Sequence, residues 1–207
     1  MGLILYKIKS KFLDLFGNIR ISKYPPFVYY DDTVFAMDGE HIKKALNIAK
    51  PGYVILRGYD CYLDGLFIKS SRKYSHAGLV VENGKVIHAV SPNVEKIDMI
   101  DFMQCDRIAI LKPRKYLNGA VAIAKKYLKE NVPYDFGFTH GEETLYCFEL
   151  AACCYPKLSI KKKIASILCG LIKKKEPVYL SDSFFDSKDF ELVYEFNPRY
   201  NIDYCKR

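Results

Sequence analysis

The chain reads SHAGLVVENGKVIHA from Ser75 to Ala89. Two short apolar runs flank Glu82–Lys85, whose Asn-Gly pair is the strongest short sequence signal for a β-hairpin turn. Side chains alternate between the two faces of a strand. The stretch therefore predicts two antiparallel neighbouring strands, with His76 on the first and His88 on the second.

The register of this hairpin decides whether the two histidines can meet. If the turn is the tight Asn83-Gly84 one, Leu79 lies opposite His88. His76 and His88 are then not directly opposite, so a bulge, a twist or a diagonal reach is needed to bring the rings together. For either histidine alone, an imidazole with a purely structural role is the competing interpretation.

Cys147 is the candidate nucleophile. It stands in LYCFEL, residues Leu145–Leu150, between a polar segment that contains glycine and an apolar run that Pro156 ends. This placement predicts the first turn of a helix, where unpaired backbone N–H groups favour a thiolate and can bind an oxyanion. A neighbouring imidazole would activate the thiol further. A buried structural cysteine is the alternative interpretation.

Together, these segments resemble the circularly permuted papain-like superfamily, in which histidine precedes cysteine along the chain. Further matches to its YiiX-like branch are Lys50–Leu56, Val132–Phe138 and Val178–Phe185, so that the resemblance covers residues 50–197. The superfamily also contains the lecithin:retinol acyltransferase family and relatives of the NlpC-type cell-wall peptidases. The resemblance implies an α+β fold, in which an antiparallel sheet packs on the helix that carries the nucleophilic cysteine.

The same resemblance implies roles for individual residues. Cys147 is expected to be the nucleophile, His76 the general base and His88 the group that orients His76, with a thioester intermediate. The backbone N–H of Cys147 is expected to be one oxyanion donor. Glu149 and Tyr134 are expected to face the substrate. The alternatives are a solvated first-turn carboxylate for Glu149 and a simple turn around Tyr134.

Two positions depart from the family pattern. Tyr53 occupies the place of an aspartate, and Phe148 occupies the place of a serine after the nucleophile. Neither change removes a catalytic atom. A ring beside the thiol is expected to narrow the substrate site or make it more apolar.

Length and composition predict a single domain. Half of the 207 residues are hydrophobic, which is enough for one sizeable core. We expect a helical N-terminal extension at residues 1–49 packed on a core at 50–197. Within that core we expect strands between residues 53 and 112, a helix at 117–131, the cysteine helix and a closing strand Phe190–Phe196.

The seven cysteines are an odd number and show no CxxC spacing. An odd number argues against a disulfide framework and favours a reducing compartment. The missing spacing argues against a zinc site, so we expect neither a metal nor a cofactor.

The formal net charge of +8 raises the question of an anionic partner. Lys161–Lys163 and Lys173–Lys175 flank the apolar residues 164–172, an arrangement that suits contact with an anionic membrane or a cell-wall polymer. A solvated helix face is the alternative, and we favour it. No nucleic-acid-binding motif occurs, so we expect no nucleic-acid partner.

The N-terminal residues Met1–Arg20 have apolar side chains at helical spacing. They lack the apolar core and cleavage site of a signal peptide, and no segment has the roughly 20 apolar residues that cross a bilayer. We expect this stretch to pack on the core of a cytoplasmic protein. Peripheral contact with a membrane, or with the cell wall of a host, is the minor alternative.

Three functions remain open from the sequence. The first is a cysteine hydrolase, an amidase or peptidase, acting on cell-wall peptide or a similar amide in a bacterial or phage setting. The second is a lipid-directed thiol acyltransferase or hydrolase at a membrane surface, with an acyl substrate. The third is a non-catalytic binding module of the same fold. The intact set of Cys147, His76 and His88 favours an enzyme.

Overall fold

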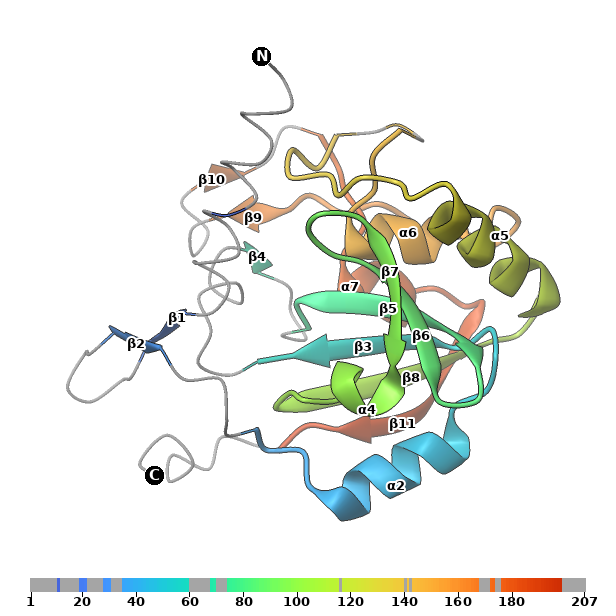
Figure 1. Cartoon of the computed structure of the whole chain (residues 1–207). Coiled ribbons are helices and arrows are strands. Elements are labelled where there is room, and N and C mark those ends of the chain that lie inside the picture. Colours follow the sequence, from blue (N-terminus) through green and yellow to red (C-terminus); the bar gives the residue numbers. More distant parts are fainter. Residues whose placement is uncertain are drawn as a thin grey trace.

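The computed structural model describes residues 35–59, 74–115, 117–139, 141, 143–167 and 176–198, together with residue 11 and four short strands outside these ranges. Its centre is a six-stranded antiparallel sheet in the order β11-β8-β3-β5-β6-β7 (Figure 1). In chain order these strands are β3 (Val54–Gly58), β5 (His76–Glu82), β6 (Lys85–Ala89), β7 (Val94–Asp98), β8 (Arg107–Pro113) and β11 (Phe190–Phe196).

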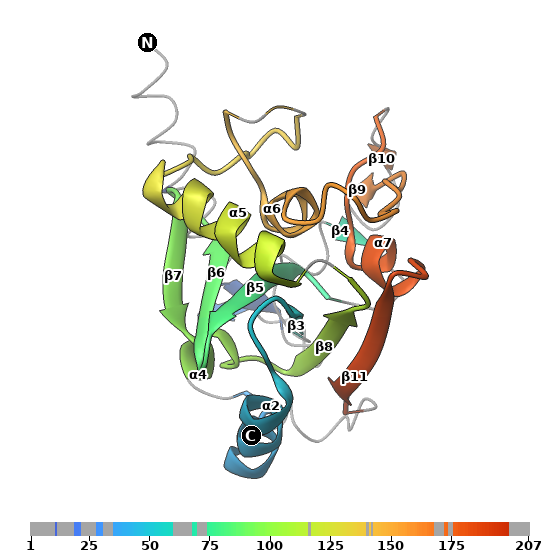
Figure 2. The same cartoon turned by 90° about the vertical axis from the view of Figure 1, so that its right-hand side faces the viewer.

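Helices cover both faces of this sheet (Figure 2). One face carries α5 (Leu117–Lys129) and α6 (Cys147–Cys153), and the other carries α2 (Gly39–Ile48) and α4 (Met99–Phe102). A fifth helix, α7 (Ser181–Phe185), lies beside β11. The predicted α+β class is confirmed, with the sheet packed on the helix that carries Cys147.

Strand alternation divides the interior into two cores. Ala77, Leu79 and Ile87 point toward α5 and α6, whereas Val80 and Val86 point toward α2 and α4. The position of a polar residue along these strands therefore decides which of the two cores its side chain faces.

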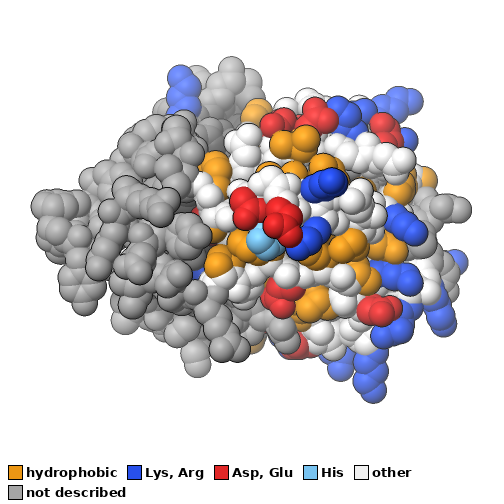
Figure 3. All heavy atoms as spheres, turned by 90° about the horizontal axis from the view of Figure 1, so that it is seen from below, with side chains coloured by type: hydrophobic (Ala, Val, Ile, Leu, Met, Phe, Trp, Pro, Cys, Tyr) orange, Lys and Arg blue, Asp and Glu red, His pale blue; other side chains and the backbone are white. Residues whose placement is uncertain are grey.

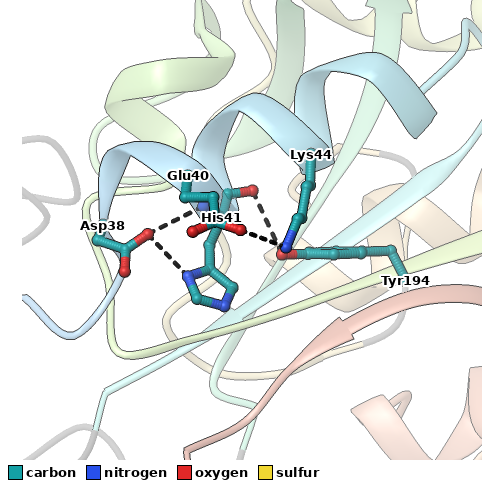
Figure 4. Close-up of polar contacts among 5 residues, drawn as sticks. All are labelled: Asp38, Glu40, His41, Lys44 and Tyr194. Carbon is teal, nitrogen blue, oxygen red and sulfur yellow. Dashed lines mark hydrogen bonds and ion pairs between the residues drawn. The ribbon is translucent and has the colours of Figure 1, made fainter.

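Helix α2 is fixed to β11 by polar contacts (Figure 4) and by a ring contact. Asp38 caps the helix by accepting a hydrogen bond from the backbone N–H of His41 at 2.9 Å. The His41 ring lies 4.1 Å from that of Phe196, and the hydroxyl of Tyr194 donates to the His41 carbonyl at 3.3 Å. Figure 3 shows acidic and basic side chains mixed with apolar ones on the face of the molecule seen from below.

The expected register of the β5–β6 hairpin is correct at the turn and wrong beyond it. Glu82 pairs with Lys85, but a β-bulge follows, and His88 lies opposite Gly78 instead of Leu79. One extra residue on β5 shifts the pairing by one position. The residues of β5 on the far side of the bulge from the turn therefore exchange faces relative to β6. The bulge therefore puts His76 and His88 on the same face of the sheet.

Several other predicted elements can be placed. Helix α5 begins at the expected residue and ends two residues early, and β11 has the predicted bounds. Within residues 1–49 the structure describes α2 and a two-stranded pair, β1 (Ile19–Ile21) with β2 (Val28–Tyr30), so this stretch is not helical throughout. Most of the amphipathic stretch 1–20 lies outside the described residues.

The segment between the two lysine triplets is extended where the structure describes it. β9 (Ser166–Ile167) pairs with β10 (Ile172–Lys173) and with β4 (Ile68–Lys69) in a three-stranded sheet. A helix over this segment would require consecutive helical residues, and residues 161–167 contain none. The solvated helix face that we favoured for this segment is therefore wrong for its described part.

Gly78 lies at a closely packed point of the face that carries the two histidines. A Cβ atom there would lie 2.5 Å from Cγ1 of Val86 and 3.0 Å from a ring carbon of Phe102. We expect Gly78→Ala to lower the free energy of unfolding by about 1–3 kcal/mol, because the backbone or its neighbours must shift. The measurement is the urea midpoint by circular dichroism.

Gly119→Ala in α5 is the matched control, because a Cβ there meets nothing within 4 Å. It should leave stability unchanged or raise it, since alanine favours a helix over glycine. Equal effects of the two substitutions would contradict close packing at Gly78.

Candidate active site

A row of polar side chains crosses four neighbouring strands on one face of the sheet. Arg57 on β3 lies directly opposite His76 on β5, and His88 on β6 lies directly opposite Glu95 on β7. Because His88 also lies opposite Gly78, two residues from His76, the two histidines are diagonal neighbours on this face. β3, β5, β6 and β7 lie side by side in this order (Figure 1).

Hydrogen bonds connect three members of this row. Nε2 of His76 lies 2.7 Å from Nδ1 of His88, and the two rings meet edge to face with centroids 5.0 Å apart. Nε2 of His88 lies 3.0 Å from Oε1 of Glu95. The structure thus brings together the two histidines that the sequence placed on one hairpin, and it adds a carboxylate that sequence reasoning missed.

Phe102 of α4 covers the middle of the row. Its ring centroid lies 5.6 Å from that of each histidine, and the guanidinium of Arg57 lies 4.7 Å above it. Nη1 of Arg57 also donates to the Phe102 carbonyl at 3.3 Å. The ring excludes water from the inner histidine, since the exposed fraction of His88 is 2%.

Cys147 is the first residue of α6, directly after the N-cap Tyr146. Cys147 is 4% exposed, and its thiol lies 3.9 Å from the carbonyl oxygen of Ser75, next to the start of β5. Burial raises the pKa of the thiol to about 11, and the backbone N–H of Ala77 acts in the opposite direction. The N–H groups at the start of α6 and the charge of Arg57 also lower this pKa, but less than burial raises it.

The thiol and the histidine pair meet along the same short segment of backbone. Ser75 and Ala77, which both contact the thiol, are the two chain neighbours of His76. Among the described residues no hydrogen bond joins the thiol to the His76 ring. The structure therefore brings the three predicted residues to one place, with only the two rings directly bonded.

The charge state of the resting site follows from its burial. Burial lowers the pKa of His76 well below its ordinary value, and the nearby Arg57 and His88 lower it further. Burial also lowers the pKa of His88, although the hydrogen bond to Glu95 partly opposes this effect. At neutral pH the site thus contains a neutral thiol and two neutral imidazoles, rather than a thiolate beside an imidazolium.

Arg57 is another member of the site that sequence reasoning missed. Its charge lowers the pKa of both histidines and of the Cys147 thiol. The available signal was a single cation inside VILRG, the otherwise apolar strand Val54–Gly58. Because a charge is costly to bury, a cation at such a position points to a specific local role.

Tyr134 lies in a segment that supports the cysteine helix. Its neighbour Asp135 donates its backbone N–H to the carbonyl of Leu145 at 3.1 Å, and Leu145 donates to the carbonyl of Pro133 at 3.0 Å. Leu145 stands two residues before Cys147, so these bonds hold the approach to the nucleophile. The Tyr134 side chain is half-buried, with its ring against that of Phe136.

Glu149 is 4% exposed, so the interpretation of a solvated carboxylate is wrong. Burial raises the pKa of Tyr146 and Tyr179, and the charge of Glu149 raises both further, which places Glu149 near these two rings. A role of Glu149 or Tyr134 toward substrate stays a prediction.

The two residues that depart from the family pattern are both buried. Tyr53 is 6% exposed and belongs to the core with α2, and Phe148 is 1% exposed, with its ring centroid 6.5 Å from that of Phe184. A ring held in the core takes no volume from an open site. The expected narrowing of the site by Phe148 is therefore not seen.

The described residues do not form a metal site. No group of three or more histidine, cysteine, aspartate or glutamate side chains in the described part of the chain could hold a metal ion. His88 has both ring nitrogens engaged by His76 and Glu95, which leaves it no lone pair for a metal. Within the same part of the chain, no helix has the length and apolar character required to cross a membrane.

Comparison with known proteins gives a family match and a solved structure of similar fold. No curated protein matches the chain. The crystal structure of the metalloprotein yiiX from Escherichia coli O157:H7 (DUF1105) is similar, with a TM-score of 0.56 and 18% sequence identity over 73% of this chain and 99% of that chain. At this identity the likeness shows a shared fold.

The family match is more direct, because it covers residues 48–194. This range includes every residue of the polar row and the cysteine helix. The family is described as permuted papain-like amidase enzymes, YaeF/YiiX, and it is a family of cysteine peptidases and amidases. The chain therefore belongs to the C92 family of permuted papain-like amidases and is an enzyme of the cysteine hydrolase kind.

Proposed function

We propose that the chain is a cysteine amidase or peptidase that uses Cys147 as nucleophile, His76 as general base and His88 as the group that orients His76. The observation that carries the proposal is the position of the thiol at the start of α6, against the backbone on both sides of His76, whose ring is bonded to His88 at 2.7 Å. We further propose a cell-wall peptide, or a similar short peptide-like amide, as the substrate.

The reaction would proceed through a thioester. His76 accepts the thiol proton while Sγ of Cys147 attacks the carbonyl carbon, and the N–H groups at the start of α6 stabilise the oxyanion. The C–N bond then breaks, and the proton passes from His76 to the leaving amine. Water, deprotonated by His76, hydrolyses the thioester and restores the thiol. The thiol and the imidazole need to approach only at the moment of attack, because catalytic contacts often tighten when substrate binds.

The alternative of a lipid-directed enzyme lacks a specific observation in its favour. Its strongest sequence feature was the pair of lysine triplets, of which the structure describes the first. There, Lys163 forms an ion pair with Asp186, and Lys162 lies over the ring of Tyr179. These lysines thus have partners within the chain.

The first prediction concerns the nucleophile. Cys147→Ala should abolish release of free amine from short cell-wall peptides, with a loss in kcat of about 10⁴-fold or more, since no other group can form the thioester. Amine release is measured by mass spectrometry. Cys153→Ala, at the other end of α6, is the matched control and should retain activity. Activity that survives in Cys147→Ala would rule out the thioester, and peptide binding without turnover in the wild type would favour the binding module.

The second prediction concerns the pH dependence of activity. A base must be neutral to accept a proton, and the pKa of His76 lies well below its ordinary value. The value of kcat/KM should therefore stay level as pH falls from 8 through about 6.5, and decline only in more acidic solution. Arg57→Met should move this decline to higher pH, because the Arg57 charge lowers the His76 pKa.

The control for this profile is Arg114→Met, which removes an exposed arginine at 4.0 Å from Glu191 on the outer strand β11. It should leave the profile unchanged. A wild-type decline centred at or above pH 6.5 would show that the base is not His76.

The third prediction concerns the resting thiol. Alkylation of Cys147 by iodoacetamide should be slow at neutral pH and increase with pH toward a midpoint near 11, because burial raises the pKa to about that value. Site-resolved mass spectrometry follows the modification. Rapid alkylation at pH 7, lost in His76→Ala, would instead show a preformed thiolate and imidazolium pair.

A further inference from the structure

The polar row ends at a carboxylate that the proposed mechanism does not use. Glu95 lies on β7, the edge strand of the sheet, and its side chain is 50% exposed. Across the ladder from it, His88 has a side chain only 3% exposed. The hydrogen-bonded series Glu95, His88, His76 therefore runs from an exposed carboxylate, through the buried His88, to the half-buried His76 beside the nucleophile.

We propose that Glu95 is a positioning residue that selects the tautomer of His88 and, through it, the tautomer of His76. The proposal rests on the function given above, because it assigns which nitrogen of the general base is free to accept the thiol proton.

The assignment follows from counting donors and acceptors. A carboxylate only accepts, so the proton between Glu95 and His88 belongs to Nε2 of His88. A neutral imidazole has one N–H and one lone pair, so Nδ1 of His88 must be an acceptor. That nitrogen lies 2.7 Å from Nε2 of His76, which must then donate. Nδ1 of His76 is left with its lone pair.

The selected tautomer is the one that catalysis needs. Nε2 of His76 is occupied by His88, so Nδ1 is the nitrogen that can take the proton from the thiol. During attack the proton moves from Sγ of Cys147 to Nδ1 of His76, and the two N–H groups on Nε2 of the histidines stay where they are. Without an acceptor at position 95, His88 can carry its proton on Nδ1 instead. His76 would then accept at Nε2 and hold its own proton on Nδ1, where it cannot act as a base.

The negative charge of Glu95 also favours proton transfer to His76. When His76 takes the proton, a positive charge appears in a buried place already facing Arg57, which disfavours it. Glu95 is the carboxylate hydrogen-bonded to the other end of the histidine pair, and this hydrogen bond opposes the fall in the His88 pKa caused by burial. It also holds the pKa of Glu95 below its ordinary value, so that the group is ionised at neutral pH.

The backbone holds Glu95 in register for this role. Val94 donates its N–H to the carbonyl of Val132 at 2.9 Å, and the five residue pairs of the β6–β7 ladder include His88 with Glu95. The loop Val132–Asp135 that anchors β7 also supports the start of the cysteine helix through Leu145. The carboxylate and the nucleophile are thus positioned by the same segment.

The test uses Glu95→Gln in the full chain. A glutamine has the same shape but can donate as well as accept, so it no longer selects a tautomer. Long-range ¹H–¹⁵N spectra of histidine-labelled protein should show His76 and His88 as Nε2–H tautomers in the wild type, and His88 wholly or partly as the Nδ1–H form in Glu95→Gln. The value of kcat should fall about 10- to 100-fold, by analogy with the groups that orient metal-bound histidines from their far side, with KM little changed.

Asp98→Asn is the matched control, because Asp98 lies on the same strand and pairs with Lys85 at 2.8 Å, away from the histidines. It should change neither the spectra nor kcat, and both variants should keep the urea midpoint of the wild type. Unchanged histidine tautomers in Glu95→Gln, or the same spectral change in Asp98→Asn, would overturn the proposal.

The spectra also separate this proposal from the proposed function. If the wild type cleaves no amide but the tautomers still change in Glu95→Gln, the amidase assignment fails and the role of Glu95 stands. If Cys147-dependent cleavage is observed and the tautomers do not respond, the amidase stands and Glu95 is only a surface neighbour.

Discussion

The hydrogen bond between His76 and His88 depends on one extra residue in β5. Near the turn, Glu82 faces Lys85, and continuing that register would put His88 opposite Leu79, on the face of α5 and α6. The bulge between Val80 and Glu82 moves the pairing by one residue, so that His88 faces Gly78. The shift puts His88 on the face where the His76 ring, the Phe102 ring and the Arg57 guanidinium lie.

Burial is the second constraint, and it determines the form of the chemistry. The thiol at the start of α6 is close to backbone N–H groups, which favour a thiolate, yet desolvation has the larger effect and keeps it protonated. Desolvation lowers the pKa of the two histidines instead of raising it, and so keeps them neutral as well. A neutral thiol and a neutral base suit an enzyme in which proton transfer accompanies attack. Such a resting thiol is also protected from adventitious alkylation and oxidation, because the thiolate is the reactive form.

The sequence predicted those features that local patterns encode. The Asn-Gly turn located the hairpin, the polar-to-apolar change before Cys147 located the start of α6, and the run Phe190–Phe196 located β11. The position of the bulge could not be predicted from the sequence. The segment Leu79–Val81 contains no glycine or proline to mark an extra residue, and apolar side chains are buried in either register. Arg57 and Glu95 were missed for a different reason: each lies near the histidines only through strand order and pairing, which are long-range properties.

The charged residues at the two ends of the row, Arg57 and Glu95, have opposite effects on the protonation of the histidines between them. Arg57 lies opposite His76 and favours its neutral form, as a base requires before attack. Glu95 lies opposite His88 and, in our proposal, favours the protonated pair that forms during attack. An arginine alone would leave His76 too weak a base for a thiol of raised pKa, and a glutamate alone would favour an imidazolium that cannot accept a proton. Because strand pairing places both charges within one row, the balance between them is set by the fold, and a one-residue slip of β3 or β7 would remove it.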